Sequence, residues 1–119
     1  MHVLIIGGAP LLREAVGVLA KEHGAAQVVT ASTACEARRA IARKKDRPFD
    51  VILADIDLDH VSGLHLHGIL AENGRLERSR FAFMTAYATP DERDYAVRKR
   101  IPIIPKRFLH DAIPRLLGA

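Results

Sequence analysis

Three polar side chains stand where apolar stretches of the sequence end. Asp55 follows DVILA at 50–54, Thr85 ends FAFMT at 81–85, and Lys106 follows shortly after IPII at 101–104. A further apolar stretch, at 2–6, ends in the pair Gly7-Gly8. A hydroxyl, an ammonium group and a glycine-rich turn at a helix start can together hold an anion or small molecule. They can act together only if the stretches are neighbouring strands, so the elements must be placed first.

The chain alternates predicted strands with predicted helices. Apolar runs with β-branched members read as buried strands, and apolar residues at spacings of three and four read as helix faces. In the first helix this face holds Leu12, Ala15, Val16 and Leu19, and in the second Thr33 and Glu36 form a possible capping box. The predicted strands are 2–6, 27–31, 50–54, 81–85 and 101–104. The predicted helices are 10–23, one from Thr33 to about 45, 63–72, one opening at Thr89-Pro90, and a short last one interrupted by Pro114.

This order predicts an α/β fold with one central parallel sheet. Strands that are apolar throughout must be covered on both faces, and right-handed crossovers place helices on both. For five strands the common doubly wound, flavodoxin-like order is 2-1-3-4-5, with five helices on two faces. Ligands of such sheets bind at the carboxyl ends of the strands. Gly7-Gly8, Asp55, Thr85 and Lys106 all fall at those ends, which makes this edge the expected site.

Composition narrows the class of protein. We expect 119 residues to form one domain, 1–119, and 49% apolar residues are enough for a sizeable core. No apolar run approaches the ~18 residues of a membrane helix, and the N-terminal stretch does not resemble a secretion signal, so we expect a cytoplasmic, bacterial-type protein. A single cysteine, Cys35, excludes an internal disulfide framework, and we expect it on a helix near the core. The formal net charge is only +4, and aromatic residues make up 5%.

The spacing of the site residues resembles the receiver domain of two-component response regulators, the CheY-like family. The most specific stretch is 49–64, FDVILADIDLDHVSGL, with an acidic residue, a hydrophobic run, Asp55, and Gly63 at the eighth position beyond it. Thr85 followed by Ala86, Lys106 after the last strand, and Arg13 in the first helix also match that family's pattern. The resemblance covers essentially the whole chain.

The resemblance implies a phosphotransfer chemistry. Asp55 would be the phosphoacceptor, attacking the phosphohistidine of a histidine kinase or phosphotransfer protein to form an aspartyl phosphate. Thr85 would offer its hydroxyl to a phosphate oxygen, and Lys106 would pair with the acyl phosphate. In the family, a divalent cation held by this aspartate and an acidic pair at the first strand-to-helix turn neutralises the incoming charge.

The acidic pair is replaced here by Gly7 and Gly8, which have no side chains. Lys106 can then neutralise Asp55 without a metal, so we expect a direct contact between them, no cofactor, and weak or absent Mg²⁺ binding. Asp57 is a weak candidate for restoring a cation site. These departures identify an atypical receiver, or pseudo-receiver.

The parts that read out the phosphorylated state also depart from the family. Asp59 stands where the family usually has proline, and Ile103 where it has the switch aromatic. Pro105 precedes Lys106, and Arg107 replaces the proline that usually follows. We therefore expect Ile103 to stay packed rather than to exchange between core and solvent.

Other motifs fit the sequence less well. Asp55-Ile56-Asp57-Leu58-Asp59 is superficially similar to a calcium loop, but His60 occupies the glycine position and Leu66 the twelfth. The same segment is similar to the DxD nucleophile motif of haloacid-dehalogenase-type phosphatases. That motif lies on the first strand of a larger chain, whereas here it is on the third of five strands. His65 and His67 point different ways on a helix, which disfavours a metal site. The basic run from Arg38 to Arg47 is read as a solvated helix face, with an acidic-partner or nucleic-acid surface as the minority interpretation.

Three functional hypotheses follow. The first is a signalling receiver that acts by protein–protein contact with weak or absent phosphorylation of Asp55. The second is a working phosphoacceptor, and the third an anion- or small-molecule-binding module using Gly7-Gly8, Thr85 and Lys106. We expect no enzyme with turnover, no membrane association and no dedicated DNA-binding element. The expected partners are a histidine kinase, a phosphotransfer protein or an output protein. The sequence leaves the cognate kinase, the pathway and the oligomeric state open.

Overall fold

The computed structural model describes residues 1–118. Its strands are β1 (His2–Ile6), β2 (Gln27–Ala31), β3 (Val51–Asp55), β4 (Asp57–Leu58), β5 (Val61–Ser62), β6 (Arg80–Thr85) and β7 (Ile103–Pro105). Its helices are α1 (Pro10–Glu22), α2 (Ala34–Arg43), α3 (Gly63–Glu72), α4 (Pro90–Lys99), the 3₁₀ turn η1 (Lys106–Phe108) and α5 (Leu109–Gly118).

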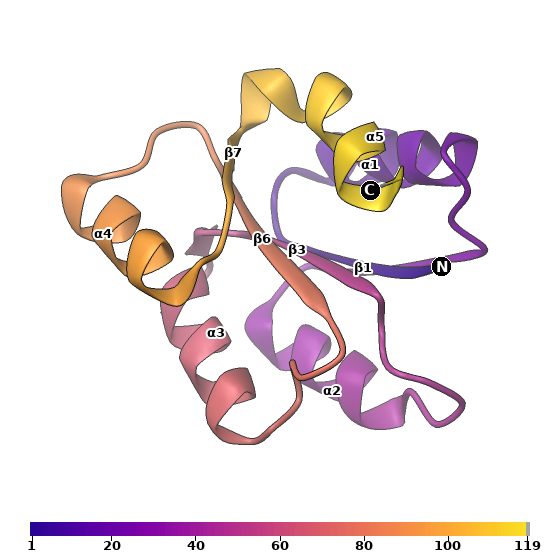
Figure 1. Cartoon of the computed structure of the whole chain (residues 1–119), viewed down its shortest axis with the longest axis horizontal. Coiled ribbons are helices and arrows are strands. Elements are labelled where there is room, and N and C mark those ends of the chain that lie inside the picture. The colour runs from indigo at the N-terminus through magenta and orange to yellow at the C-terminus, as the bar shows by residue number, and fades with distance from the viewer. Residues whose placement is uncertain (119) are drawn as a thin grey trace.

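The main sheet has five parallel strands in the order β2-β1-β3-β6-β7. This is the predicted 2-1-3-4-5 order, because β4 and β5 form a separate two-stranded hairpin. α1 and α5 lie together on one side of the sheet, and α2 and α3 lie on the other (Figure 1). The predicted doubly wound architecture is confirmed.

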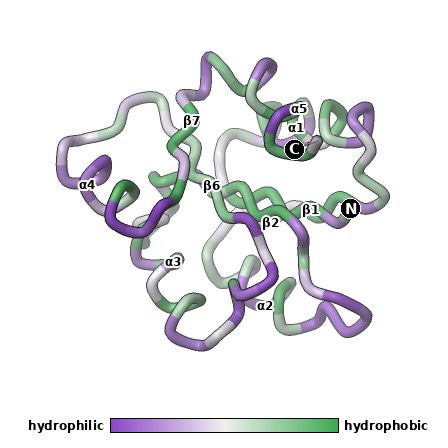
Figure 2. Tube along the Cα trace, viewed as in Figure 1, coloured by the Kyte–Doolittle hydropathy of each residue, from purple (hydrophilic) through white to green (hydrophobic). Residues whose placement is uncertain are grey.

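Each face of the sheet has its own core. On one face Leu4, Ile52 and Phe83 pack with α2, α3 and α4, and on the other Ile5 and Leu53 pack with α1 and α5. The central strands are uniformly hydrophobic, whereas hydrophilic residues gather on the outer helices and loops (Figure 2). Burial on both faces is why the strands lack an alternating polar pattern.

Local signals set the helix starts. Pro10 and Pro90 occupy first-turn positions, where a missing N–H costs nothing. Thr89 and Glu92 form the predicted reciprocal capping box. Thr33 accepts from the Glu36 N–H as predicted, but the Glu36 carboxylate bonds the backbone and hydroxyl of Ser32 instead of completing the box.

Several element boundaries differ from the sequence prediction. The third strand runs one residue later than predicted, so Asp55 is its last residue. The last strand begins at Ile103, because the Ile101 N–H bonds back to the Ala96 carbonyl and closes α4. The hairpin and η1 were not predicted. Pro114 lies inside α5 without interrupting it.

Two side chains are placed differently from expectation, since Ala15 and Cys35 are exposed. His67, for which the sequence made no prediction of burial, is buried. Packing against α5 and β2 turns α1 so that Val16, Gly17 and Ala20 face inward instead of Ala15. Cys35 lies on the outer face of α2, since Ala34 and Ala37 face the core.

Candidate functional site at the carboxyl edge of the sheet

The carboxyl ends of β1, β3, β6 and β7 bring the predicted site residues to one edge. Asp55 pairs in register with Met84, and Thr85 with Pro105, so the two polar residues and the start of η1 follow one another across the sheet. Gly63 closes the loop after Asp55, and its N–H donates to the Ile56 carbonyl at 2.7 Å. A Cβ at Gly63 would lie 2.5 Å from the Asp55 carbonyl oxygen, so the loop requires glycine there.

The Asp55 carboxylate is engaged through both oxygens. Oδ2 lies 2.7 Å from Lys106 Nζ, and Oδ1 accepts a 2.9 Å hydrogen bond from the Asp57 N–H. Asp55 is 2% exposed, whereas the Lys106 side chain is 30% exposed and still reaches solvent. The predicted Asp55–Lys106 contact is therefore present, and it balances a buried negative charge.

The Thr85 hydroxyl is bound to its own loop. Thr85 is 2% exposed, and its Oγ1 donates to the Tyr87 carbonyl at 3.1 Å and accepts from the Tyr87 N–H at 3.3 Å. Within residues 1–118 it forms no hydrogen bond to Asp55 or Lys106. The edge thus joins Asp55 directly to Lys106, with Thr85 beside the pair but turned to the β6–α4 loop.

The Gly7-Gly8 turn is held in a conformation that suits glycine. The two φ angles are +79° and +78°, a left-handed region that side chains rarely adopt. A Cβ at Gly7 would lie 2.4 Å from Leu58 Cδ2 and 2.9 Å from Asp55 Cβ. The Arg13 guanidinium donates to the Gly8 carbonyl and ties the turn to α1. Leu58, from the β4–β5 hairpin, therefore lies against the turn where the resemblance would place carboxylates.

These residues do not fit a divalent cation. Hard cations take carboxylate and carbonyl oxygens, and here the one buried carboxylate already holds an ammonium group. Asp57 is exposed and offers its N–H, not its carboxylate, to Asp55. Within the described residues, no group of three His, Cys, Asp or Glu side chains is placed to share a metal ion.

The sequence also matches a family model. The response regulator receiver domain model covers residues 3–115. The chain belongs to this family. Among curated proteins, no sequence matches it.

Solved receivers share the fold at low identity. The chemotaxis response regulator CheY4 of Vibrio cholerae is 17% identical over 98% of each chain, with a TM-score of 0.77. A DNA-binding response regulator of the LuxR family from Staphylococcus aureus is 17% identical, covers 94% of this chain and 92% of its own, and has a TM-score of 0.79. The signal receiver domain of the putative response regulator NarL from Mycobacterium tuberculosis is 19% identical over 96% and 90%, with a TM-score of 0.79.

The sequence prediction does not include two residues of the receiver site. Leu58 lies in a stretch rich in aspartate, where an apolar residue between Asp57 and Asp59 is a signal that the loop buries a side chain. Tyr87, whose backbone holds the Thr85 hydroxyl, had no sequence signal, since any residue supplies a carbonyl and an N–H.

No helix within residues 1–118 is long and apolar enough to cross a membrane.

Proposed function

We propose that this receiver domain acts in two-component signalling as a regulatory protein–protein interaction module whose Asp55 is phosphorylated weakly or not at all. The observation that carries the proposal is that both oxygens of the acceptor carboxylate already have partners. Lys106 and the Asp57 N–H engage its two oxygens, and Gly7 and Gly8 supply no carboxylates beside it.

The chemistry disfavours stable phosphorylation. A phosphoryl group on Asp55 would add negative charge in a buried position, and without a metal Lys106 is the cation that already contacts this carboxylate. Each oxygen of the carboxylate already has one partner, which lowers its nucleophilicity toward phosphorus. We propose no catalytic turnover, and protein partners of the kinase, phosphotransfer or output class.

Phosphodonor treatment read by intact mass tests the proposal. The chain is incubated with acetyl phosphate, with and without Mg²⁺, beside Asp55→Asn, which keeps an acceptor for the Asp57 N–H but cannot form the acyl phosphate. We expect that neither protein will show a phosphorylated species in its mass spectrum. A phosphorylated species in the wild type alone would favour the alternative, a working phosphoacceptor.

Metal binding is a separate test. We expect no saturable Mg²⁺ binding, because each missing carboxylate weakens a hard-cation site. A dissociation constant near or below ~1 mM, about −4 kcal/mol, would contradict this. If such binding were lost in Asp57→Ala, Asp57 would be the residue that restores the site and the phosphoacceptor function would gain support.

A further inference from the structure

The amino ends of the strands, opposite the Asp55 edge, hold a second candidate site. A cleft of about 380 Å³ opens between the loop before β3 and the loop before β6. It is held together by the Ser79 hydroxyl, which donates to the Phe49 carbonyl at 2.6 Å, and by the Arg80 N–H, which donates to the Asp50 carbonyl at 2.8 Å. The volume falls within the range of small-ligand sites, roughly 300–1,000 Å³.

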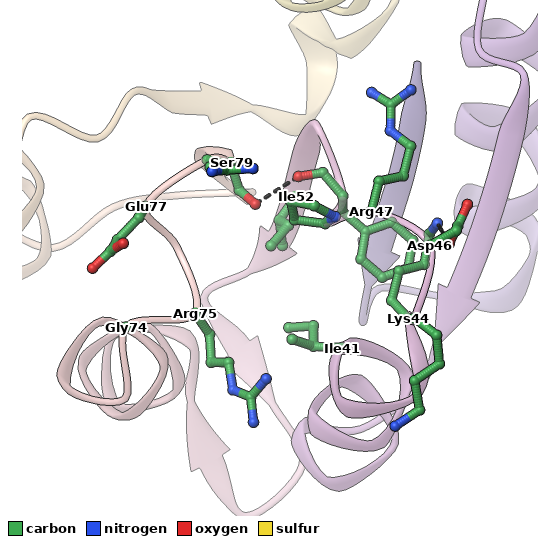
Figure 3. A pocket seen from close by; sticks show the side chains of 13 residues that line it. Ile41, Lys44, Asp46, Arg47, Ile52, Gly74, Arg75, Glu77 and Ser79 are labelled. Atoms are coloured by element: carbon green, nitrogen blue, oxygen red, sulfur yellow. Dashed lines mark hydrogen bonds and ion pairs between the residues drawn. The ribbon is translucent and has the colours of Figure 1, made fainter.

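The rim of this cleft is strongly cationic. Five Lys and Arg residues line it against two acidic residues; the basic ones are Lys44, Lys45, Arg47, Arg75 and Arg78, and the acidic ones Asp46 and Glu77. Lys44 binds Asp46 at 2.7 Å, and Arg47 binds Asp50 at 2.7 Å. In Figure 3 the carboxylate of Glu77 points away from the cleft.

Three of these five basic side chains have no ion-pair partner among the described residues. Lys45 comes from one loop, and Arg75 and Arg78 from the other; within residues 1–118 none of them forms an ion pair. Arg75 extends from its loop toward Ile41, across the opening (Figure 3). The ends of α2 and α3 beside them favour positive charge, which accounts for some basic residues here. It does not account for two arginines three positions apart that form no ion pair with Glu77 between them, since like charges repel.

We propose that this cleft binds a compact polyphosphate anion, of the nucleoside diphosphate or triphosphate class. Guanidinium groups match phosphate oxygens with two parallel hydrogen bonds, and the ammonium of Lys45 adds a point charge from the opposite wall. A multiply charged ligand can span both loops, which a single carboxylate cannot do. The half-buried side chain of Ile41 supplies an apolar wall beside the phosphates.

The test is a titration of the full chain followed by amide chemical shifts, with ATP, inorganic pyrophosphate and adenosine as probes in Mg²⁺-free buffer. We expect ATP to shift the amides of 44–47, Phe49 and 74–79 and to leave the Asp55 edge unmoved, and adenosine to shift neither. Pyrophosphate binding as tight as ATP would also support the site and assign recognition to the phosphate chain. Shifts centred on Asp55 and Lys106, shifts with adenosine, or none with ATP or pyrophosphate would overturn the proposal.

Charge-reversal variants separate a site from a general charge effect. Arg75→Glu and Arg78→Glu change exposed loop residues and should each weaken ATP binding about tenfold or more, equivalent to about 1.4 kcal/mol. Arg38→Glu, on the exposed face of α2 outside the cleft, changes the net charge equally and should have little effect. Equal weakening by all three variants would contradict the proposal, as would tighter binding of an acidic peptide than of ATP at these amides.

Discussion

At the scale of single residues, the receiver site is shaped by what Gly7 and Leu58 do together. Gly7 adopts φ +79° and leaves space that Leu58 Cδ2 approaches from the hairpin. The loss of a carboxylate at this position is therefore matched by an apolar contact. Restoring an acidic side chain at Gly7 would require both a strained backbone and displacement of Leu58.

Gly7→Ala should lower the free energy of unfolding by about 2–4 kcal/mol, from left-handed strain and overpacking. In a Leu58→Ala background the added cost should fall but stay above the backbone strain of about 1–2 kcal/mol, because the added Cβ would still lie 2.9 Å from Asp55 Cβ. Gly74→Ala is the matched control, because Gly74 also has positive φ (+68°) but its added Cβ would meet its nearest atom at 3.6 Å, an ordinary contact. Urea unfolding measures all four variants, and purely additive effects of Gly7→Ala and Leu58→Ala would refute the contact.

The Asp55–Lys106 pair makes a second prediction at this scale. Lys106→Ala leaves a carboxylate that is 2% exposed without its cation, and should cost about 1–3 kcal/mol, less than a fully buried pair because Lys106 itself reaches solvent. Asp55→Asn should cost less, since Lys106 can turn outward and the amide oxygen still accepts from the Asp57 N–H. The midpoints of denaturant unfolding compare them, and a larger loss in Asp55→Asn would be inconsistent with this account.

At the scale of elements, α3 and α4 are joined by an aromatic cluster over β6. His67 Nδ1 lies 2.8 Å from the Tyr95 hydroxyl, and its ring meets Phe81 and Phe83 edge-on with centroids 5.0 and 6.1 Å apart. Burial, with a smaller contribution from the Lys99 charge, lowers the pKa of His67 below its ordinary value of 6.5. The neutral imidazole is thus the form that fits between the two helices.

A lowered histidine pKa predicts a definite sign for the pH dependence. Below pH 6.5 the unfolded chain binds this proton more readily than the folded chain, so stability is fully present above pH 6.5 and falls as the pH drops toward the folded-state pKa. His67→Phe should lose less stability than the wild type between pH 7 and pH 5. Thermal unfolding across that range measures it, and parallel pH profiles for the two proteins would rule out His67 as the source.

At the scale of the whole molecule, exposed basic residues lie on either side of β7, at the end of α4 and in η1, and the surface of these three elements is the candidate partner face. Arg98, Lys99, Arg100 and Arg107 lie there, and Val97 and Phe108 are exposed beside them. Ile103 is half-buried and packs against the core, and it has no polar tip to exchange between core and solvent. A receiver switches only if phosphorylation favours one conformation of this face over another. Because no metal would fix the phosphoryl group and no aromatic residue stands at position 103, we expect that preference to be small.

We predict that this face binds an acidic protein partner in one constitutive conformation, with affinity that falls as salt is raised. Partner binding or amide shifts of the face should be the same for wild type and Asp55→Ala, with and without a phosphodonor. A tenfold change, about 1.4 kcal/mol, on phosphodonor addition to the wild type alone would show a working switch instead.

The sequence by itself determined the order of the five sheet strands and the five α-helices, and the edge where the site lies. Uniformly apolar strands such as 51–54 can be buried only between two layers of helices, and parallel strands bring Asp55, Thr85 and Lys106 to the same edge. Proline at helix starts and the Thr89–Glu92 box depend on neighbours a few residues away, so they too could be predicted.

Only the tertiary structure decided which atoms meet. The contact of Leu58 with the Gly7 turn, the bond of Thr85 to Tyr87, and the burial of His67 against Tyr95 join residues whose proximity depends on loop path and helix rotation. The cleft between the loops before β3 and β6 arises in the same way, from segments about 30 residues apart that the register of two neighbouring strands sets side by side. Such contacts are selected by packing of the whole core, and no local pattern in the sequence encodes them.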